Sequence, residues 1–221
     1  MERYERNIPA ISTEECEKLK TKHVAVIGCG GLGGYIIELL ARIGVGKITV
    51  CDGDVFGVSN LNRQILCTED DLGKSKALQA ADRIMSVNSG VEVGCFDEFM
   101  TNENVSEIIS GCDIVFDALD DISARKILAK ACERYNVPYI YGAISGWAFQ
   151  AAVCLPGSGL IEKLFPEHVE ITDKSVLAFT PSMCASFQVS LGLKVLLGRE
   201  VEPSRVYYVD LLFSETECID F

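Results

Sequence analysis

The sequence is poor in positive charge and lacks any long apolar run. It has 20 lysines and arginines against 32 aspartates and glutamates, a formal net charge of −12. This deficit disfavours nucleic acid as the partner, because Lys and Arg side chains bind phosphate backbones. No apolar stretch approaches the ~20 residues of a membrane span, and the charged beginning, Met-Glu-Arg-Tyr-Glu-Arg, has no apolar signal region. We therefore expect no membrane association.

Cysteine is plentiful, but the spacings that bind zinc or form redox pairs are missing. None of the ten cysteines stands in a Cys-x-x-Cys pair. Cys51 and Cys132 lie within apolar patterns, which favours buried free thiols in a reducing compartment and predicts a cytoplasmic protein. The two histidines, His23 and His168, have no evident partner pattern, and we assign them no role.

Short apolar strands alternate with helical patterns through the first two thirds of the chain. Residues 24–28 form a β-branched run typical of a buried parallel strand. The alternation predicts an α/β fold, a Rossmann-like, doubly wound and mostly parallel sheet with helices on both faces. Further strands are predicted at 47–52, 91–95, 113–117 and 138–142, with helices at 73–87, 103–110 and 122–135.

The last third follows a different pattern, with strands predicted at 148–155 and 205–212 and a helix at 182–197. We expect an antiparallel C-terminal extension of the sheet there, and between about 156 and 180 a loop that crosses the nucleotide-binding face. One domain then covers residues 1–221. It consists of an N-terminal arm or helix at 1–22, a βα core at 23–145, and at 146–221 the crossover loop with a C-terminal extension.

A glycine cluster opens the first helix directly after the first strand. Gly28-x-Gly30-x-x-Gly33 in this context predicts nucleotide binding, because glycines let the backbone approach phosphates at a helix N-terminus. Gly31 lies within the same loop. Asp52 ends the second strand, where a carboxylate can accept hydrogen bonds from ribose hydroxyls. The motif alone leaves NAD(P) and ATP both open.

The segment Asp52-Gly-Asp54-Val-Phe-Gly-Val-Ser-Asn60-Leu-Asn-Arg63-Gln64 favours adenylyl transfer. A dehydrogenase needs no guanidinium beside the phosphates. Adenylylation brings an attacking carboxylate against an anionic triphosphate, and Arg63 and Lys76 would offset that charge. We expect Asn60 and Gln64 to supply orienting hydrogen bonds.

Two aspartates follow the strand at 113–117, at the carboxyl edge of the predicted sheet. Mg²⁺ prefers one or two carboxylates together with substrate phosphates. Asp120 is the predicted Mg²⁺ ligand, and we expect Asp121 to serve as a helix N-cap instead.

These residues resemble the ThiF/MoeB/HesA adenylyltransferases, prokaryotic relatives of the ubiquitin-activating enzymes. The resemblance runs from Arg3 to about Asp210 and rests on ordered elements: Gly-x-Gly-Gly-Leu-Gly, Asp-x-Asp, Ser-Asn-Leu-x-Arg-Gln and Gly-Lys-x-Lys. The resemblance implies that Asp52 and Asp54 lie in the nucleotide site, with ribose at Asp52. It also implies that phosphates are bound by Asn60, Arg63, Gln64 and Lys76, and Mg²⁺ by Asp120.

The N-terminal Tyr-Glu-Arg6-Asn also resembles the family, in which this arginine reaches the nucleotide of the other subunit. The resemblance thus implies a homodimer and an Arg6 finger in trans. The chain departs from the family at the structural zinc. Gly157 and Leu160 stand where relatives carry the first Cys-x-x-Cys pair, so we predict no zinc site.

The resemblance implies adenylylation of a ubiquitin-like sulfur carrier (ThiS/MoaD type) ending in Gly-Gly, with ATP and Mg²⁺. It also implies that 23–145 is the nucleotide-binding core and that 146–221 carries the carrier-binding extension. Residues 156–180 hold no cysteine for a later thiol step. Of the nearest thiols, Cys184 at the predicted helix start is the better candidate and Cys154 the poorer, but we expect both to be buried and structural. The alternatives are another carboxylate (modified tRNA or a peptide C-terminus), an NAD(P)-dependent oxidoreductase, and a non-catalytic scaffold subunit.

Overall fold

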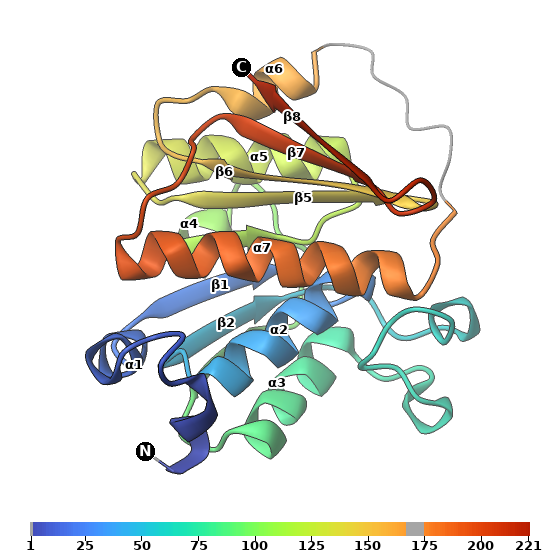
Figure 1. Cartoon of the computed structure of the whole chain (residues 1–221). Helices are drawn as coiled ribbons and strands as arrows, with labels where there is room; N and C mark the ends of the chain where they lie inside the picture. The colour runs from blue at the N-terminus through green and yellow to red at the C-terminus, as the bar shows by residue number, and fades with distance from the viewer. Residues whose placement is uncertain (1, 167–174) are drawn as a thin grey trace.

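An eight-stranded sheet organises the chain, shown by a computed structural model that describes residues 2–166 and 175–221. The strands lie side by side in the order β3-β2-β1-β4-β5-β6-β7-β8 (Figure 1). Their bounds are β1 His23–Ile27, β2 Lys47–Cys51, β3 Glu92–Phe96, β4 Ile114–Asp117, β5 Tyr139–Ser145, β6 Ala148–Cys154, β7 Arg205–Asp210 and β8 Glu215–Asp220.

The first five strands are parallel, as the sequence predicts. β1 pairs with β2 on one side and with β4 on the other, and β3 and β5 continue the sheet outward. Val24, Val26 and Ile27 of β1 are at most 1% exposed, because a central parallel strand is covered on both faces. The chain therefore changes winding direction between β1 and β4. Ligands of such sheets bind at this switch point, outside the carboxyl ends of the strands.

The remaining strands are antiparallel. β5 pairs with β6, β6 with β7, and β7 with β8, each in the antiparallel sense. This confirms the predicted fold class, a mostly parallel sheet with an antiparallel C-terminal extension. The tight turn between β5 and β6 makes the change of direction possible, since antiparallel neighbours need no crossover helix.

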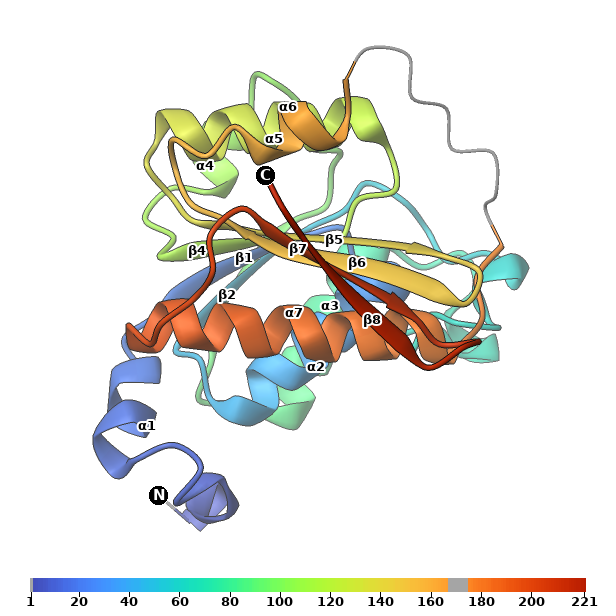
Figure 2. The same ribbon diagram turned by 45° about the horizontal axis from the view of Figure 1, so that its top comes forward.

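Helices cover both faces of the sheet. Figure 2 shows α4, α5 and α6 on one face and α2, α3 and α7 on the other. Each face buries its own apolar cluster, one including Ile36, Leu40 and Val189 and the other including Ile108 and Leu128. The α-helices are α1 Thr13–Leu19, α2 Gly31–Ile43, α3 Lys76–Val87, α4 Val105–Ile108, α5 Ile122–Arg134, α6 Leu160–Leu164 and α7 Phe179–Leu197; the 3₁₀ helices are η1 Glu2–Asn7, η2 Val58–Asn60 and η3 Glu69–Asp71.

The structure corrects several predicted elements. β8 was not predicted, because all six of its residues are exposed and no apolar alternation marks them. The predicted loop at 156–180 contains the short helix α6, and α7 begins at Phe179 rather than at 182. The helix predicted at 103–110 is reduced to the four residues of α4. Residues 167–174, which include His168, lie outside the described part of the chain.

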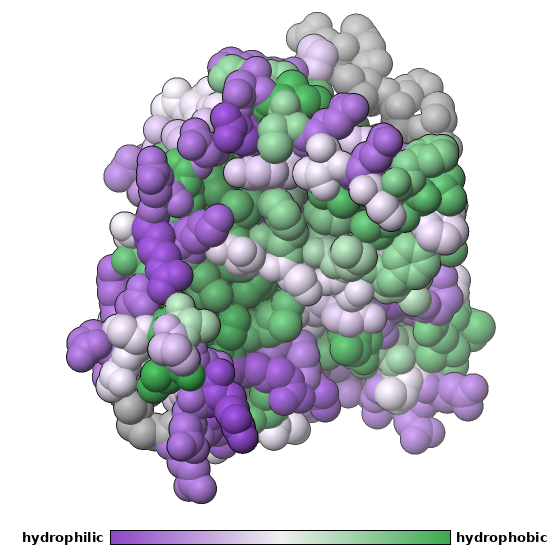
Figure 3. Space-filling model, viewed as in Figure 1, coloured by the Kyte–Doolittle hydropathy of each residue, from purple (hydrophilic) through white to green (hydrophobic). Residues whose placement is uncertain are grey.

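The face carrying α7 has an apolar surface patch near the start of that helix (Figure 3). Trp147 and Phe179 pack ring to ring with centroids 5.0 Å apart, and both are at least 40% exposed. Leu212 and Phe213, in the turn between β7 and β8, are more exposed still. Within residues 2–166 and 175–221, no helix is long and apolar enough to cross a membrane.

Candidate functional site

A cavity of about 450 Å³ lies at the switch point of the sheet, where β1, β2 and β4 end. The described end of the 156–180 segment also reaches it, through Val176, which forms an isolated bridge with Gly146. The structure brings together in the wall of this cavity most of the residues predicted from sequence: Gly28, Gly30, Gly31, Asp52, Asp54, Arg63, Gln64, Lys76 and Asp120.

The glycine loop between β1 and α2 depends on two glycines for its path. Gly28 has φ +97°, and a Cβ there would lie 2.6 Å from the carbonyl oxygen of Ala118. A Cβ on Gly33 would lie 1.8 Å from the carbonyl oxygen of Gly28. Side chains at either position would separate the loop from β4 and from α2. The glycines thus hold the start of α2 against the cavity, with its free N–H groups and positive dipole end available to an anion.

Asp52 is fastened at the end of β2 by both carboxylate oxygens. Oδ2 accepts a hydrogen bond from the Cys29 backbone N–H at 2.7 Å, and Oδ1 accepts one from Asp54 N–H at 2.8 Å. Burial raises the pKa of this carboxyl above its ordinary value, although the two N–H donors oppose the shift. The carboxylate is thereby oriented toward the cavity and linked to the glycine loop, as a ribose-binding group requires.

Asp52→Asn is expected to weaken ATP binding by roughly 10- to 100-fold, which corresponds to the free energy that a hydrogen bond to a charged group contributes. The amide keeps the shape but has one acceptor oxygen for two N–H groups. Because the pKa of Asp52 is raised, ionisation costs folding stability at neutral pH, and this cost disappears as pH falls through the raised pKa. The ionised form accepts ribose hydroxyls, so binding by the unaltered protein should weaken as pH falls.

Isothermal titration calorimetry with ATP between pH 5 and 8 would check this. Protonation of the nucleotide itself also changes the affinity over this range, and Asp52→Asn, which lacks the carboxyl group, measures that part of the pH dependence. If both proteins showed the same affinity at pH 7, Asp52 would have no role in binding nucleotide.

Arg63 and Gln64 face the glycine loop from the segment after β2. A Cβ on Gly31 would lie 3.5 Å from Arg63 Cγ, so the aliphatic stem rests on the loop. Arg63 Nη1 donates to the Ser59 carbonyl and to Asn62 Oδ1, each at 2.8 Å. Gln64 is 6% exposed, and its Oε1 has no hydrogen-bond partner among the described residues. A buried acceptor in that state costs free energy, so a polar ligand would stabilise it.

Lys76 is the buried cation of the cavity. The residue is 7% exposed, and its Nζ lies 3.0 Å from Asp54 Oδ2. Its position at the first turn of α3 is set by Ser75, which caps the helix by accepting from Leu78 N–H. The exposed Asp54 carboxylate pairs with the ammonium and holds it in the cavity wall.

Asp120 and Asp121 take different positions in the turn after β4. Asp121 Oδ1 accepts from Ala124 N–H at 2.7 Å and caps α5, as predicted. Asp120 is exposed in the cavity wall. The described residues contain no group of three or more His, Cys, Asp or Glu side chains that could enclose a metal. One carboxylate in a cavity wall fits Mg²⁺, which proteins bind with one or two carboxylates together with substrate phosphates and water.

A buried ion pair that the sequence analysis missed forms the floor of the site. Arg125 Nε donates to Asp117 Oδ2 at 2.6 Å, with both side chains at most 3% exposed. Arg125 Nη2 donates to the carbonyls of Leu119 and Gly142, and Tyr139 donates its hydroxyl to Asp117. Burial raises the pKa of Asp117, which Arg125 opposes. Arg125 also lines the cavity, so it ties the turn carrying Asp120 to β5.

Three predicted residues lie outside the cavity wall. Gly33 packs behind the loop, and Asn60 Oδ1 accepts from Gly57 N–H at 2.9 Å within its own turn. Arg6 is exposed on η1. Tyr4 fastens this 3₁₀ helix by accepting from Asn88 Nδ2 at 2.7 Å, beyond the C-terminal end of α3. That end lies opposite the carboxyl edge of the sheet, so Arg6 is remote from the cavity of its own chain.

Neither candidate cysteine is placed for thiol chemistry. Cys184 is fully buried well inside α7, which begins at Phe179, so the predicted position at a helix start is wrong. Cys154 is 7% exposed at the end of β6. Burial raises the pKa of both thiols. The expectation of buried structural thiols is confirmed, and all ten cysteines are free.

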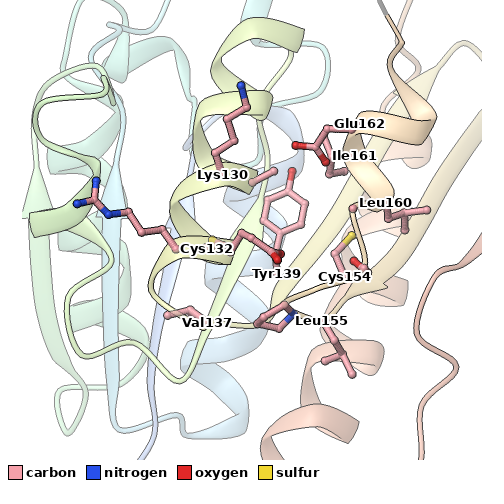
Figure 4. Close-up of a pocket in the computed structure, with 15 residues that line it drawn as sticks. Lys130, Cys132, Val137, Tyr139, Cys154, Leu155, Leu160, Ile161 and Glu162 are labelled. Atoms are coloured by element: carbon pink, nitrogen blue, oxygen red, sulfur yellow. The ribbon is translucent and has the colours of Figure 1, made fainter.

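A second cavity, of about 360 Å³, lies between α5 and the segment leading into α6 (Figure 4). Tyr139 and Cys154 line it, while Lys130 of α5 and Glu162 of α6 stand nearer its rim. None of the residues predicted for the nucleotide site contributes to its wall. The Asp117–Arg125 pair separates the two cavities, because Tyr139 bonds Asp117 from one side and Arg125 lines the other.

Fold and site together define a Rossmann-like α/β protein with a glycine-loop cavity at the switch point of its sheet. Residues 4–219 match the ThiF family, and the chain belongs to that family. The SAMP-activating enzyme E1 of Haloferax volcanii is 32% identical, across 100% of this chain and 85% of that protein. The sulfur carrier protein adenylyltransferase of Thermus thermophilus is 34% identical, across 90% of this chain and 78% of that protein.

Solved structures agree on the fold. The crystal structure of E. coli MccB superimposes with a TM-score of 0.87 at 20% identity, covering 99% of this chain and 69% of that chain. Family membership and the adenylyltransferases among the relatives make this chain an enzyme of the adenylyltransferase class. The geometry of the cavity must then explain how the chain performs such a transfer.

Proposed function

We propose that the chain uses ATP and Mg²⁺ to adenylylate the C-terminal carboxylate of a ubiquitin-like sulfur-carrier protein, releasing pyrophosphate. The cavity carries the proposal, because its wall contains the glycine loop together with Arg63, Gln64, Lys76, Asp52 and Asp120. The names of the Haloferax and Thermus relatives support a protein substrate of this class.

The reaction joins two anions, so the site must offset negative charge. A carboxylate oxygen of the carrier attacks the α-phosphorus of ATP, the bond to the bridging oxygen breaks, and pyrophosphate leaves with that electron pair. The carboxylate is already ionised at pH 7, so no general base is needed. Arg63 and Lys76 bind the phosphates as cations, and the start of α2 adds backbone N–H donors.

Other residues of the site orient the nucleotide. Asp52 accepts the ribose hydroxyls, and Gln64 Oε1 is a buried acceptor for a ligand N–H or O–H group. Asp120 would hold Mg²⁺, which when bound neutralises phosphate charge. Arg125 positions the turn of Asp120 through Leu119. Positioning and charge neutralisation together supply most of the rate in such a transfer.

The surface also suits a protein partner. Trp147 and Phe179 form an exposed pair of aromatic rings near the start of α7, where the surface is apolar, and exposed apolar patches mark interaction sites. A flexible carrier tail ending in Gly-Gly is narrow enough to enter a cavity beside the glycine loop. A homodimer would allow Arg6 of a second copy to reach the phosphates, which its own chain's geometry prevents.

ATP–pyrophosphate exchange with Mg²⁺ and a panel of carriers ending in Gly-Gly would test the proposal. We expect exchange that depends on a carrier and disappears when the carrier's terminal glycine is removed. Exchange without any carrier, or with a modified tRNA or free peptide in its place, would contradict the proposed substrate. Nucleotide binding without exchange under all these conditions would contradict the proposed reaction.

A further inference from the structure

An aromatic ring stands in the cavity wall beside the ribose-binding position. Phe99 is 62% exposed and lines the cavity together with Met100 and Leu119. Single exposed apolar residues are common on protein surfaces, so exposure alone says little. Phe99 differs from such residues because hydrogen bonds hold its backbone in the cavity wall.

The backbone around Phe99 is fastened from two sides. The Phe99 carbonyl accepts from Asn104 Nδ2 at 3.0 Å, while Asn104 Oδ1 accepts from Thr101 N–H at 2.7 Å. The Glu98 carbonyl accepts from the Cys51 thiol at 3.2 Å, which links the turn to the end of β2. The ring is therefore presented by a fixed turn, and little conformational entropy would be lost when a ligand covers it.

The absence of a side chain at Gly53 allows the Phe99 ring to occupy its position. A Cβ on Gly53 would lie 2.6 Å from Phe99 N and 2.7 Å from two carbons of the ring. Gly53 does not have a positive φ, so its backbone conformation does not require glycine. The missing side chain instead lets the ring pack directly on the backbone between Asp52 and Asp54. Phe99 is thus next to the carboxylate that would bind ribose.

We propose that Phe99 determines nucleobase binding, with the base stacking on the exposed face of its ring. The inference rests on the proposed function, because it places a nucleotide in the cavity with its ribose at Asp52. A base linked to that ribose lies against Phe99 in a cavity wall to which Met100 and Leu119 also contribute apolar side chains. An aromatic ring stacks on the π-face of a base, so Phe99 adds affinity for the base of the nucleotide beyond the affinity that the phosphates supply.

The test distinguishes the contribution of the base to binding affinity from the contribution of the phosphates. Affinities for ATP and for inorganic triphosphate are measured by calorimetry with Mg²⁺ for the unaltered protein, Phe99→Ala, Phe99→Tyr and Phe221→Ala. Phe221 is a suitable control because it is 46% exposed and does not line the cavity. Phe99→Ala is expected to weaken ATP binding by roughly 5- to 100-fold, with triphosphate binding unchanged. Phe99→Tyr and Phe221→Ala are expected to bind both ligands normally.

Two results would overturn the inference alone. One is normal ATP affinity in Phe99→Ala while the unaltered enzyme catalyses exchange. The other is equal weakening of ATP and triphosphate, which would mean that the ring shapes the cavity or covers the carrier tail. A protein that binds neither ATP nor triphosphate would overturn this inference together with the proposed function.

Discussion

Arg63→Ala is expected to lower ATP–pyrophosphate exchange by about 100- to 1,000-fold, the effect of removing one preorganised donor from a charged transition state. The guanidinium is preorganised here, since its stem rests on Gly31 and its Nη1 is held by Ser59 and Asn62. Charge on the phosphates grows as pyrophosphate leaves, and alanine offers nothing to offset it.

The fold should be unaffected, because Arg63 is partly exposed and anchors no buried group. Matching denaturation midpoints would establish this. Arg42→Ala is a suitable control, since that arginine pairs with Glu38 on α2 and does not line the cavity. Arg63→Lys keeps the charge but loses the planar fork, so we expect intermediate activity. Exchange near the normal rate in Arg63→Ala would remove Arg63 from the mechanism.

Features encoded by short, local patterns were predicted correctly. The run at 24–28, the glycines behind it and the carboxylate of Asp52 specify a strand, a tight turn and a strand end within one βα unit. The parallel order of β1, β2, β4 and β5 follows, because each crossover contains a helix. The cavity lies where that order reverses, so the meeting of residues as distant as Gly28 and Asp120 could also be predicted.

Features determined by tertiary contacts were missed. β8 contains Glu-Thr-Glu-Cys-Ile-Asp, which no apolar pattern marks; its strand form depends on pairing with β7. Arg125 resembles the neighbouring Lys126 and Lys130 in sequence, and only the packing of α5 on β4 buries it against Asp117. Cys184 was predicted to lie at a helix start because no residue in the long connection before α7 marks where that helix begins. Phe99 was missed because its place in the cavity wall depends on Gly53, which lies far from it in sequence.

The Asp117–Arg125 pair yields the largest expected change in stability. Arg125→Met should lower the free energy of unfolding by about 3–5 kcal/mol, because it leaves a carboxylate buried without its cation. For a chain of this size the melting temperature should fall by about 6–20 °C. The exposed pair between Arg205 and Asp220 is the control, and Arg205→Met should change little, since exposed pairs contribute little.

The double variant Asp117→Asn/Arg125→Met distinguishes a stranded charge from lost packing. The double variant removes the buried charge while keeping much of the side-chain volume, so part of the lost free energy of unfolding should return. If the effect were simple loss of packing, the double variant would be less stable than either single variant. Urea denaturation followed by circular dichroism gives the comparison. A normal midpoint for Arg125→Met would show that the pair does not hold the floor of the site. A lowered one, with recovery in the double variant, would show that the chain accepts a costly buried charge in order to fix Leu119, and through it the turn carrying Asp120.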